Sequence, residues 1–232
     1  MSSKTERSIR GANGECPPGG LSDPEVLDPN SVEVRIGNPE KDVPRLLELF
    51  KQPKTIEHLA AITPSTTEDE IKELYRNPSL VLLTAETPSG FIVGTISVHK
   101  PGFGSRVGEG MRLVVDEKYR NLRIARKLVK SANALMFRKG EDDGSVGFGC
   151  AKAQIYVIIG VDGDGIAQRV FAREGYIRGP QNVKTTFSWS NKLAKLMDRS
   201  SQPMSLDLAW YKQNRRGEHI KSFPESRLPK VA

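Results

Sequence analysis

The residues with the clearest chemical potential lie at a predicted strand-to-helix junction, residues 113–128. An apolar strand end runs through a short loop into a helix, and no acidic residue follows Glu117 within this segment. Its cations are Lys118, Arg120, Arg123, Arg126, Lys127 and Lys130. Unpaired N–H groups and the positive end of the helix dipole make a helix N-terminus an anion site. The junction therefore suits a diphosphate, although a solvated basic helix face would carry the same charges.

The junction resembles the acyl-CoA-binding loop of the GNAT superfamily of acyl-CoA N-acyltransferases, whose pattern is Arg/Gln-x-x-Gly-x-Gly/Ala. Arg120 and Ala125 match, whereas Arg123 stands where the family most often has glycine. Glycine there permits close backbone approach or an unusual φ, while arginine can pair with phosphate or block the cradle. The resemblance implies acetyl-CoA, or another acyl-CoA, as the cofactor. It places these residues beside the cofactor: Leu113, Val114, Val115, Arg120, Asn121, Leu122, Arg123, Ile124, Ala125 and Arg126.

A second segment, Asp164–Tyr176, resembles the family's Asn-x-x-Ala-x-x-Leu-Tyr-x-x-x-Gly-Phe stretch. The positions in register are Ala167, Gly175 and Tyr176. Asp164 replaces the usual Asn, and Phe171 replaces the Tyr that in many members protonates the departing thiolate. The resemblance places Asp164 and Phe171 beside the cofactor and removes the usual general acid. Ordinary helix packing would also explain the apolar residues of this segment.

Acyl transfer to an amine needs a base, because an ammonium has no lone pair and a free lysine amine has a pKa near ~10.4. Glu109 is the candidate, since several family members carry a glutamate base at this strand position. A period of two predicts that this carboxylate shares a face with Met111, Leu113 and Val115, where apolar neighbours would raise its pKa. Exposure at a frayed strand start is the alternative.

Three further side chains and one backbone group are candidates for the site. The resemblance implies that the pantetheine arm pairs with this strand end, where the strand splays from the next, and that the Val115 N–H polarises the acyl carbonyl. Tyr156 and Tyr176 are the candidates for the missing acid, with aromatic packing as the alternative. His99 could face the acceptor or be structural. Cys150 has no obvious His or Asp partner and is not expected to act as a nucleophile.

The hydrophobic pattern predicts the elements that position the junction. The expected strands cover residues 32–36, 80–85, 91–99, 107–115, 153–159, 185–189 and 204–211, the last two as a closing pair. The expected helices start at 38–42 and stop before Pro53, start at the capping boxes of residues 65–70 and end near 77, and cover 121–137 and 164–174. The fold class is α/β (α+β). The resemblance implies a mixed, mostly antiparallel central sheet with helices on both faces.

The chain has 232 residues, of which 37% are hydrophobic, so it can bury a core. We expect a flexible N-terminal arm over residues 1–31, a GNAT-like domain over 32–211 and a basic C-terminal tail over 212–232. No apolar run approaches a membrane span, and the start lacks the apolar core of a signal peptide, so a cytoplasmic location is expected. Two cysteines, Cys16 and Cys150, are too few for a disulfide framework or a Cys-rich zinc site.

The resemblance implies an N-acetyltransferase that moves an acetyl group from acetyl-CoA to a primary amine in a direct ternary complex. Residues 53–66 and 178–203 would line the acceptor pocket. The alternative, motivated by Arg123 and Phe171, is a catalytically weak or inactive GNAT-fold component of a larger assembly, held by its two tails. The net charge of +7 favours anionic partners. No aromatic-interleaved RNA signature is present, so neither nucleic acid nor membrane is an expected partner.

Overall fold

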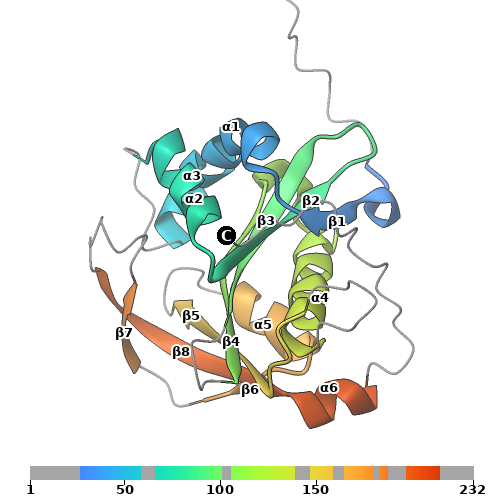
Figure 1. The fold of residues 1–232 in the computed structure, drawn as a ribbon, viewed down its shortest axis with the longest axis vertical. Coiled ribbons are helices and arrows are strands. Elements are labelled where there is room, and N and C mark those ends of the chain that lie inside the picture. Colours follow the sequence, from blue (N-terminus) through green and yellow to red (C-terminus); the bar gives the residue numbers. More distant parts are fainter. Residues whose placement is uncertain are drawn as a thin grey trace, which may run out of the picture.

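The computed structural model describes residues 27–58, 66–100, 106–138, 147–158, 165–179, 183–187 and 197–214. Their strands form one eight-stranded sheet in the order β1-β2-β3-β4-β5-β8-β6, with β7 paired to β8 (Figure 1). The strands are β1 (Glu33–Ile36), β2 (Leu80–Glu86), β3 (Ile92–His99), β4 (Val107–Val115), β5 (Lys152–Ile158), β6 (Ile177–Arg178), β7 (Val183–Phe187) and β8 (Met197–Asp207). Every pairing is antiparallel except that of β4 with β5. The predicted mixed, mostly antiparallel sheet is confirmed.

The helices begin at the signals that the sequence carries. They are α1 (Pro39–Lys51), α2 (Pro53–His58), α3 (Glu68–Arg76), α4 (Ile124–Phe137), α5 (Ile166–Arg173) and α6 (Leu208–Asn214), with the 3-10 turns η1 (Pro29–Ser31) and η2 (Glu117–Tyr119). The Asn38 side chain accepts from the first amides of α1, and Thr67 with Glu70 forms the capping box of α3. Helix α2 was not predicted, because Pro53 follows the end of α1 at Lys51 and is also the first residue of a new helix.

Two apolar cores cover the two faces of the sheet. The α4-side core packs α4 residues such as Leu128 and Leu135 against Leu83 and Ile96 of the sheet. The α1-side core has these members: Val43, Leu46, Leu49, Phe50, Ile71, Leu74, Leu80, Leu82, Ile92 and Val114. Figure 1 shows α1 and α3 on one side of β2 and β3, with α4 on the other. The prediction of helices on both faces is confirmed.

The predicted strand over Met204–Tyr211 is wrong in its second half. The observed β8 ends at Asp207, and Leu208–Asn214 forms α6. Leu208 and Tyr211 both contact the α4-side core, and their spacing of three residues is helical rather than extended. The partner of β7 is also the first half of β8, since Val183 pairs with Ser201.

The described residues do not include 1–26 and 215–232, which make up most of the predicted arm and tail. Of the predicted arm, Leu27 packs on the α4-side core. Lys127 Nζ donates to the carbonyls of Asn30, at 3.2 Å, and Val32, at 3.0 Å. Residues 27–31 therefore belong to the packed domain, and Lys212–Asn214 belongs to α6. Among the described residues, every helix is too short or too polar to cross a membrane.

Candidate active site

The loop from β4 to α4 contains two residues in the left-handed region. Before them, Asp116 Oδ1 accepts from the Lys118 amide at 2.9 Å and starts η2. Asn121 has φ 67° and Arg123 has φ 60°. Asparagine tolerates this region, whereas arginine rarely enters it. Arg123 is the N-cap of α4, and its side chain makes no capping hydrogen bond there. The helix thus begins without the side-chain cap that usually satisfies its first amide groups.

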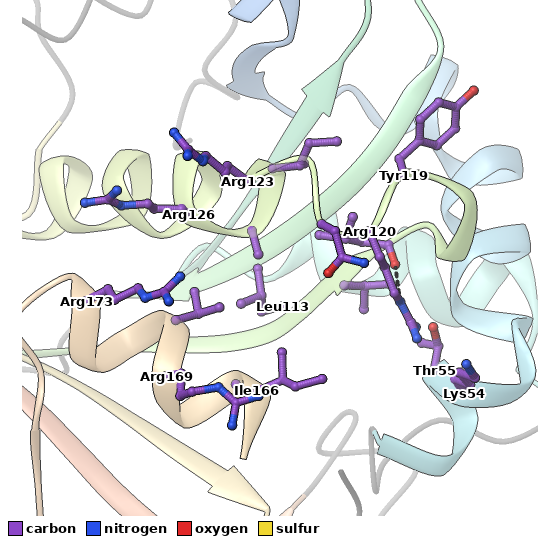
Figure 2. A pocket seen from close by; sticks show the side chains of 17 residues that line it. Lys54, Thr55, Leu113, Tyr119, Arg120, Arg123, Arg126, Ile166, Arg169 and Arg173 are labelled. Atoms are coloured by element: carbon purple, nitrogen blue, oxygen red, sulfur yellow. Dashed lines mark hydrogen bonds between the residues drawn. The ribbon is translucent and has the colours of Figure 1, made fainter. Parts of the chain in front are cut away.

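The first residues of α4 line a cleft of about 800 Å³. Six of its seventeen lining side chains are basic and none is acidic. The basic residues are Lys54, Arg120, Arg123, Arg126, Arg169 and Arg173. Figure 2 shows the arginines of α4 and those of α5 on opposite sides of Leu113. An uncapped helix N-terminus inside a basic cleft is suited to bind phosphate groups.

Helix α5 supplies one wall of the cleft, but through a face that was not assigned to the cofactor from the sequence. Its lining residues are Ile166, Ala167, Arg169, Val170 and Arg173. These positions lie on one face of a helix, because they recur at intervals of three and four residues. The helical spacing of Arg169 and Arg173 was the available signal. Lys54 and Thr55 of α2 belong to residues 53–66, which were predicted to line the acceptor pocket, and both line this cleft.

Most of the predicted cofactor residues come together in the cleft. Those that line it are Leu113, Val114, Val115, Arg120, Asn121, Arg123, Ile124, Ala125 and Arg126. Leu122 packs against the α4-side core instead. Phe171 is buried there too, with its ring centroid 5.3 Å from that of Tyr176, because it lies on the far face of α5. Asp164 lies outside the described residues.

A bulge interrupts β4 before it reaches the cleft. Ser97 pairs with Met111 and Thr95 with Val114, so β4 holds one more residue than β3 between these pairs. Arg112 has φ 53° within this extra segment, as expected for a residue in a bulge. The bulge restarts the alternation of side chains along the strand.

The bulge overturns the predicted common face of four β4 residues. Met111 and Val114 pack toward the α1-side core, whereas Leu113 and Val115 pack toward the α4-side core. Glu109 therefore shares a face with Met111 and not with Leu113 or Val115. An inserted residue interrupts the alternation of side chains between the two faces. The prediction that Glu109, Leu113 and Val115 share one face is therefore wrong.

β4 also parts from β5 at the bulge. Their ladder runs from Val107 with Lys152 to Gly110 with Ile155, while the ladder of β4 with β3 continues to Val115. In the described part of the chain, no strand pairs with the β5-facing edge of β4 beyond Gly110. That edge offers backbone donors and acceptors to an extended ligand.

Glu109 belongs to a row of polar side chains that crosses four neighbouring strands. In register, the row is His99, Glu109, Gln154 and Ser205. It lies on the sheet face opposite α4, because the alternate residue Ala153 belongs to the α4-side core. Burial raises the pKa of Glu109, and the charge of Arg112 partly opposes this shift. Burial and the same arginine lower the pKa of His99.

Arg112 lies beside this polar row. Its Nη1 donates to Ser97 Oγ at 3.3 Å, and that hydroxyl donates to the Met111 carbonyl at 3.0 Å. Burial lowers the pKa of Arg112 to about 10, and the charge of Glu109 opposes the shift. Each of these two groups thus favours the charged form of the other.

The two candidate acids occupy different surroundings. Tyr176 is buried in the core and donates to Asn133 Oδ1 at 2.7 Å, and burial raises the pKa of its phenol. The Tyr156 hydroxyl accepts from Gln154 Nε2 at 2.7 Å and lies near the polar row. The buried Cys150 thiol also has its pKa raised by burial, as expected for an inert cysteine. The described residues contain no cluster of three His, Cys, Asp or Glu that could hold a metal.

Comparison with known protein families finds a match for the region that contains the cofactor loop. The sequence model of the acetyltransferase (GNAT) family matches residues 43–146, which include β4, the junction loop and α4. This match and the fold of solved GNAT structures support a GNAT superfamily assignment. GNAT acetyltransferases use acetyl-CoA, so the predicted cofactor is the one that this family uses. A search of curated protein sequences finds no match to the chain.

Solved GNAT structures share the fold. A spermidine N-acetyltransferase from Vibrio cholerae, in complex with CoA and spermine, is 14% identical with a TM-score of 0.61, over 78% of this chain and 98% of that one. A chimera of the Vibrio cholerae enzyme SpeG and hSSAT is 17% identical with a TM-score of 0.59, over 80% of this chain and 99% of that one. At these identities the likeness establishes the fold.

Arg123, where the loop departs from the family pattern, has a backbone conformation that suits glycine. Arg123 adopts φ 60° and ψ 12°, a conformation that glycine enters without cost. Its exposed side chain follows α4 away from Leu113 in Figure 2. The loop therefore keeps a glycine-like turn at the expense of local strain.

Proposed function

We propose that the chain is an N-acetyltransferase that moves the acetyl group of acetyl-CoA to a primary amine, within one ternary complex. The observation that carries this proposal is the start of α4, where a left-handed turn without a side-chain cap lines a cleft with six basic side chains and no acids. The diphosphate and the 3′-phosphate of CoA are polyanionic, and such a site complements them.

Both backbone amides and basic side chains bind the cofactor in the proposed complex. The first amides of α4 bind the diphosphate, with Arg120 and Arg126 beside them. Arg169 and Arg173 add positive charge from α5. The cofactor supplies an activated acetyl thioester. The β5-facing edge of β4 beyond Gly110 pairs with the pantetheine arm, and the Val115 N–H polarises the acyl carbonyl.

Glu109 is the general base of the proposed reaction. It accepts a proton from the attacking amine, directly or through a water chain, so that nitrogen has a lone pair. A carboxylate whose pKa is raised by burial is a stronger base near neutral pH than an exposed one. The neighbouring charge of Arg112 keeps enough of the carboxylate ionised to act.

Tyr156 is the better candidate for the acid that protonates the departing thiolate. Its hydroxyl accepts a hydrogen bond from Gln154, so its own proton is available to donate. Gln154 is the register partner of Glu109, which brings Tyr156 to the same sheet face as the base. The phenol of Tyr176 instead donates its proton to Asn133 inside the core.

Two measurements on the full chain test this function. Calorimetric titration with acetyl-CoA and with CoA is expected to give saturable 1:1 binding at micromolar to millimolar concentration. Release of free CoA thiol, followed against a panel of primary amines, is expected to require both acetyl-CoA and an amine. Absence of CoA binding at millimolar concentration would reject the transferase. Binding without turnover on any amine would favour a GNAT-fold component that has lost activity.

A further inference from the structure

One arginine outside the cleft connects α1 and β3 to the cofactor loop. Arg45 of α1 donates from Nε to the Ile92 carbonyl at 3.0 Å and from Nη1 to Glu48 Oε2 at 2.7 Å. Its Nη2 forms an ion pair with Asp116 Oδ2. The guanidinium carbon also lies 4.1 Å from the centre of the Phe91 ring. The side chain is mostly buried, and these contacts fix the position of its guanidinium group.

Asp116 is the residue through which Arg45 reaches the loop. Its side chain is nearly fully buried, and its backbone amide donates to the Val93 carbonyl at 2.9 Å. The two carboxylate oxygens do different work: Oδ2 pairs with Arg45, and Oδ1 accepts from the Lys118 amide and caps η2. The Asp116 carbonyl accepts from the Tyr119 amide at 2.9 Å. The orientation of this carboxylate therefore fixes the path of the chain into residues 120–123.

The junction of α1 and α2 holds the same turn from a second side. Gln52 Oε1 accepts from the Glu117 amide at 3.2 Å, and Glu117 Oε1 accepts from the Lys54 amide at 3.3 Å. Lys54 itself lines the cleft. Helices α1 and α2 are thus connected to the start of η2 through Asp116 and Glu117.

We propose that Arg45 is a positioning residue for the cofactor: through Asp116 it holds the β4–α4 loop in the shape that presents the amides of α4 to the diphosphate. This inference rests on the proposed function. Arg45 does not line the cleft and touches no reacting group, so its effect passes through the loop. Without the Arg45 guanidinium, the Asp116 side chain can turn away from η2. The strained residues Asn121 and Arg123 can then leave the left-handed region.

The competing explanation is that Arg45 only stabilises the fold. The chain offers a matched control, because Arg35 pairs with the buried Asp42 and has the same side-chain exposure of 16% as Arg45. Arg35 lies on β1, also binds Glu86 and does not line the cleft. A purely structural role predicts that both arginines affect CoA binding only as far as they unfold the protein.

The test compares the CoA dissociation constants of wild type, Arg45→Met, Arg45→Lys, Asp116→Asn and Arg35→Met by calorimetry, well below each melting temperature. Arg45→Met is expected to weaken CoA binding roughly 10-fold, a typical size for an indirect effect. Arg35→Met is expected to stay within about twofold, as for an independent site. Arg45→Lys is expected to weaken binding as well, because an ammonium cannot span three acceptors.

A double variant tests whether Arg45 acts on CoA binding through Asp116 or whether the two residues contribute independently. Arg45→Met with Asp116→Asn is expected to weaken CoA binding about as much as either change alone, roughly 10-fold and not 100-fold. The KM for acetyl-CoA is expected to rise with little change in kcat. Multiplicative effects, or an Arg45→Met affinity equal to that of Arg35→Met, would overturn the inference and leave the transferase standing. Failure of the wild-type chain to bind CoA would overturn both.

Discussion

Replacing Arg123 with glycine should stabilise the protein, because it removes strain at the start of α4. Arg123 has φ 60°, where a side chain with a Cβ costs about 1–2 kcal/mol relative to the right-handed region. Glycine gives back about 0.5–1 kcal/mol of this through the greater entropy of its unfolded chain. The side chain makes no capping bond that would be lost. The expected net gain is about 0.5–1 kcal/mol.

Chemical denaturation of Arg123→Gly and Arg123→Ala measures this strain directly. Alanine removes the same charge but keeps a Cβ at positive φ, so the difference between the two variants isolates the backbone. Thermal melting should place the glycine variant roughly 1–4 °C above wild type for a chain of this size. If the two variants are equally stable, Arg123 is not held in the left-handed region and the described turn is wrong.

The same pair of variants tests whether Arg123 blocks or assists the cofactor. An exposed ion pair contributes about 0.2–1 kcal/mol, so loss of this guanidinium should weaken CoA binding less than about fivefold. The glycine variant should bind at least as well as the alanine variant, since its loop enters the required shape without strain. A large gain in affinity for both variants would instead mean that the guanidinium fills the cradle.

Three further predictions concern the base, its neighbour and the α5 wall. Glu109→Gln should lower kcat at least about 100-fold and leave the acetyl-CoA dissociation constant unchanged; unaltered turnover would remove Glu109 from its role. Arg112→Gln should move the ascending limb of the kcat/KM pH profile to higher pH, because the positive charge that it removes lowers the pKa of Glu109. An ascending limb that stays in place would show that Arg112 does not set the pKa of the base. Arg169→Ala with Arg173→Ala should weaken CoA binding roughly 10-fold, whereas Arg178→Ala, an exposed control on β6 that does not line the cleft, should not; equal effects would mean that only overall charge matters.

Local signals allowed much of the fold to be predicted. Thr67 and Glu70 form the predicted capping box, and the two strands around residues 87–90 form the predicted hairpin. The junction of β4 with α4 was also predictable, because a strand end, a polar loop and an amphipathic helix follow one another in the sequence. Each of these features depends on residues only a few positions apart.

The missed features depend on contacts between distant segments. The bulge at Arg112 is set by the pairing of β4 with β3, which a period of two along one strand cannot reveal. Phe171 and Arg169 lie on opposite faces of one helix, and only the packing of α5 decides which face meets the cleft. α6 replaces a predicted strand because Leu208 and Tyr211 reach a core built elsewhere in the chain.

The most direct test of the central claim is a structure of the chain with CoA bound. The account predicts that the diphosphate lies against the backbone amides at the start of α4, within residues 121–126, with the arginines of α4 and α5 on either side. It also predicts the pantetheine arm along β4 beyond Gly110. A diphosphate bound elsewhere, or an Arg123 guanidinium occupying its place, would contradict the account.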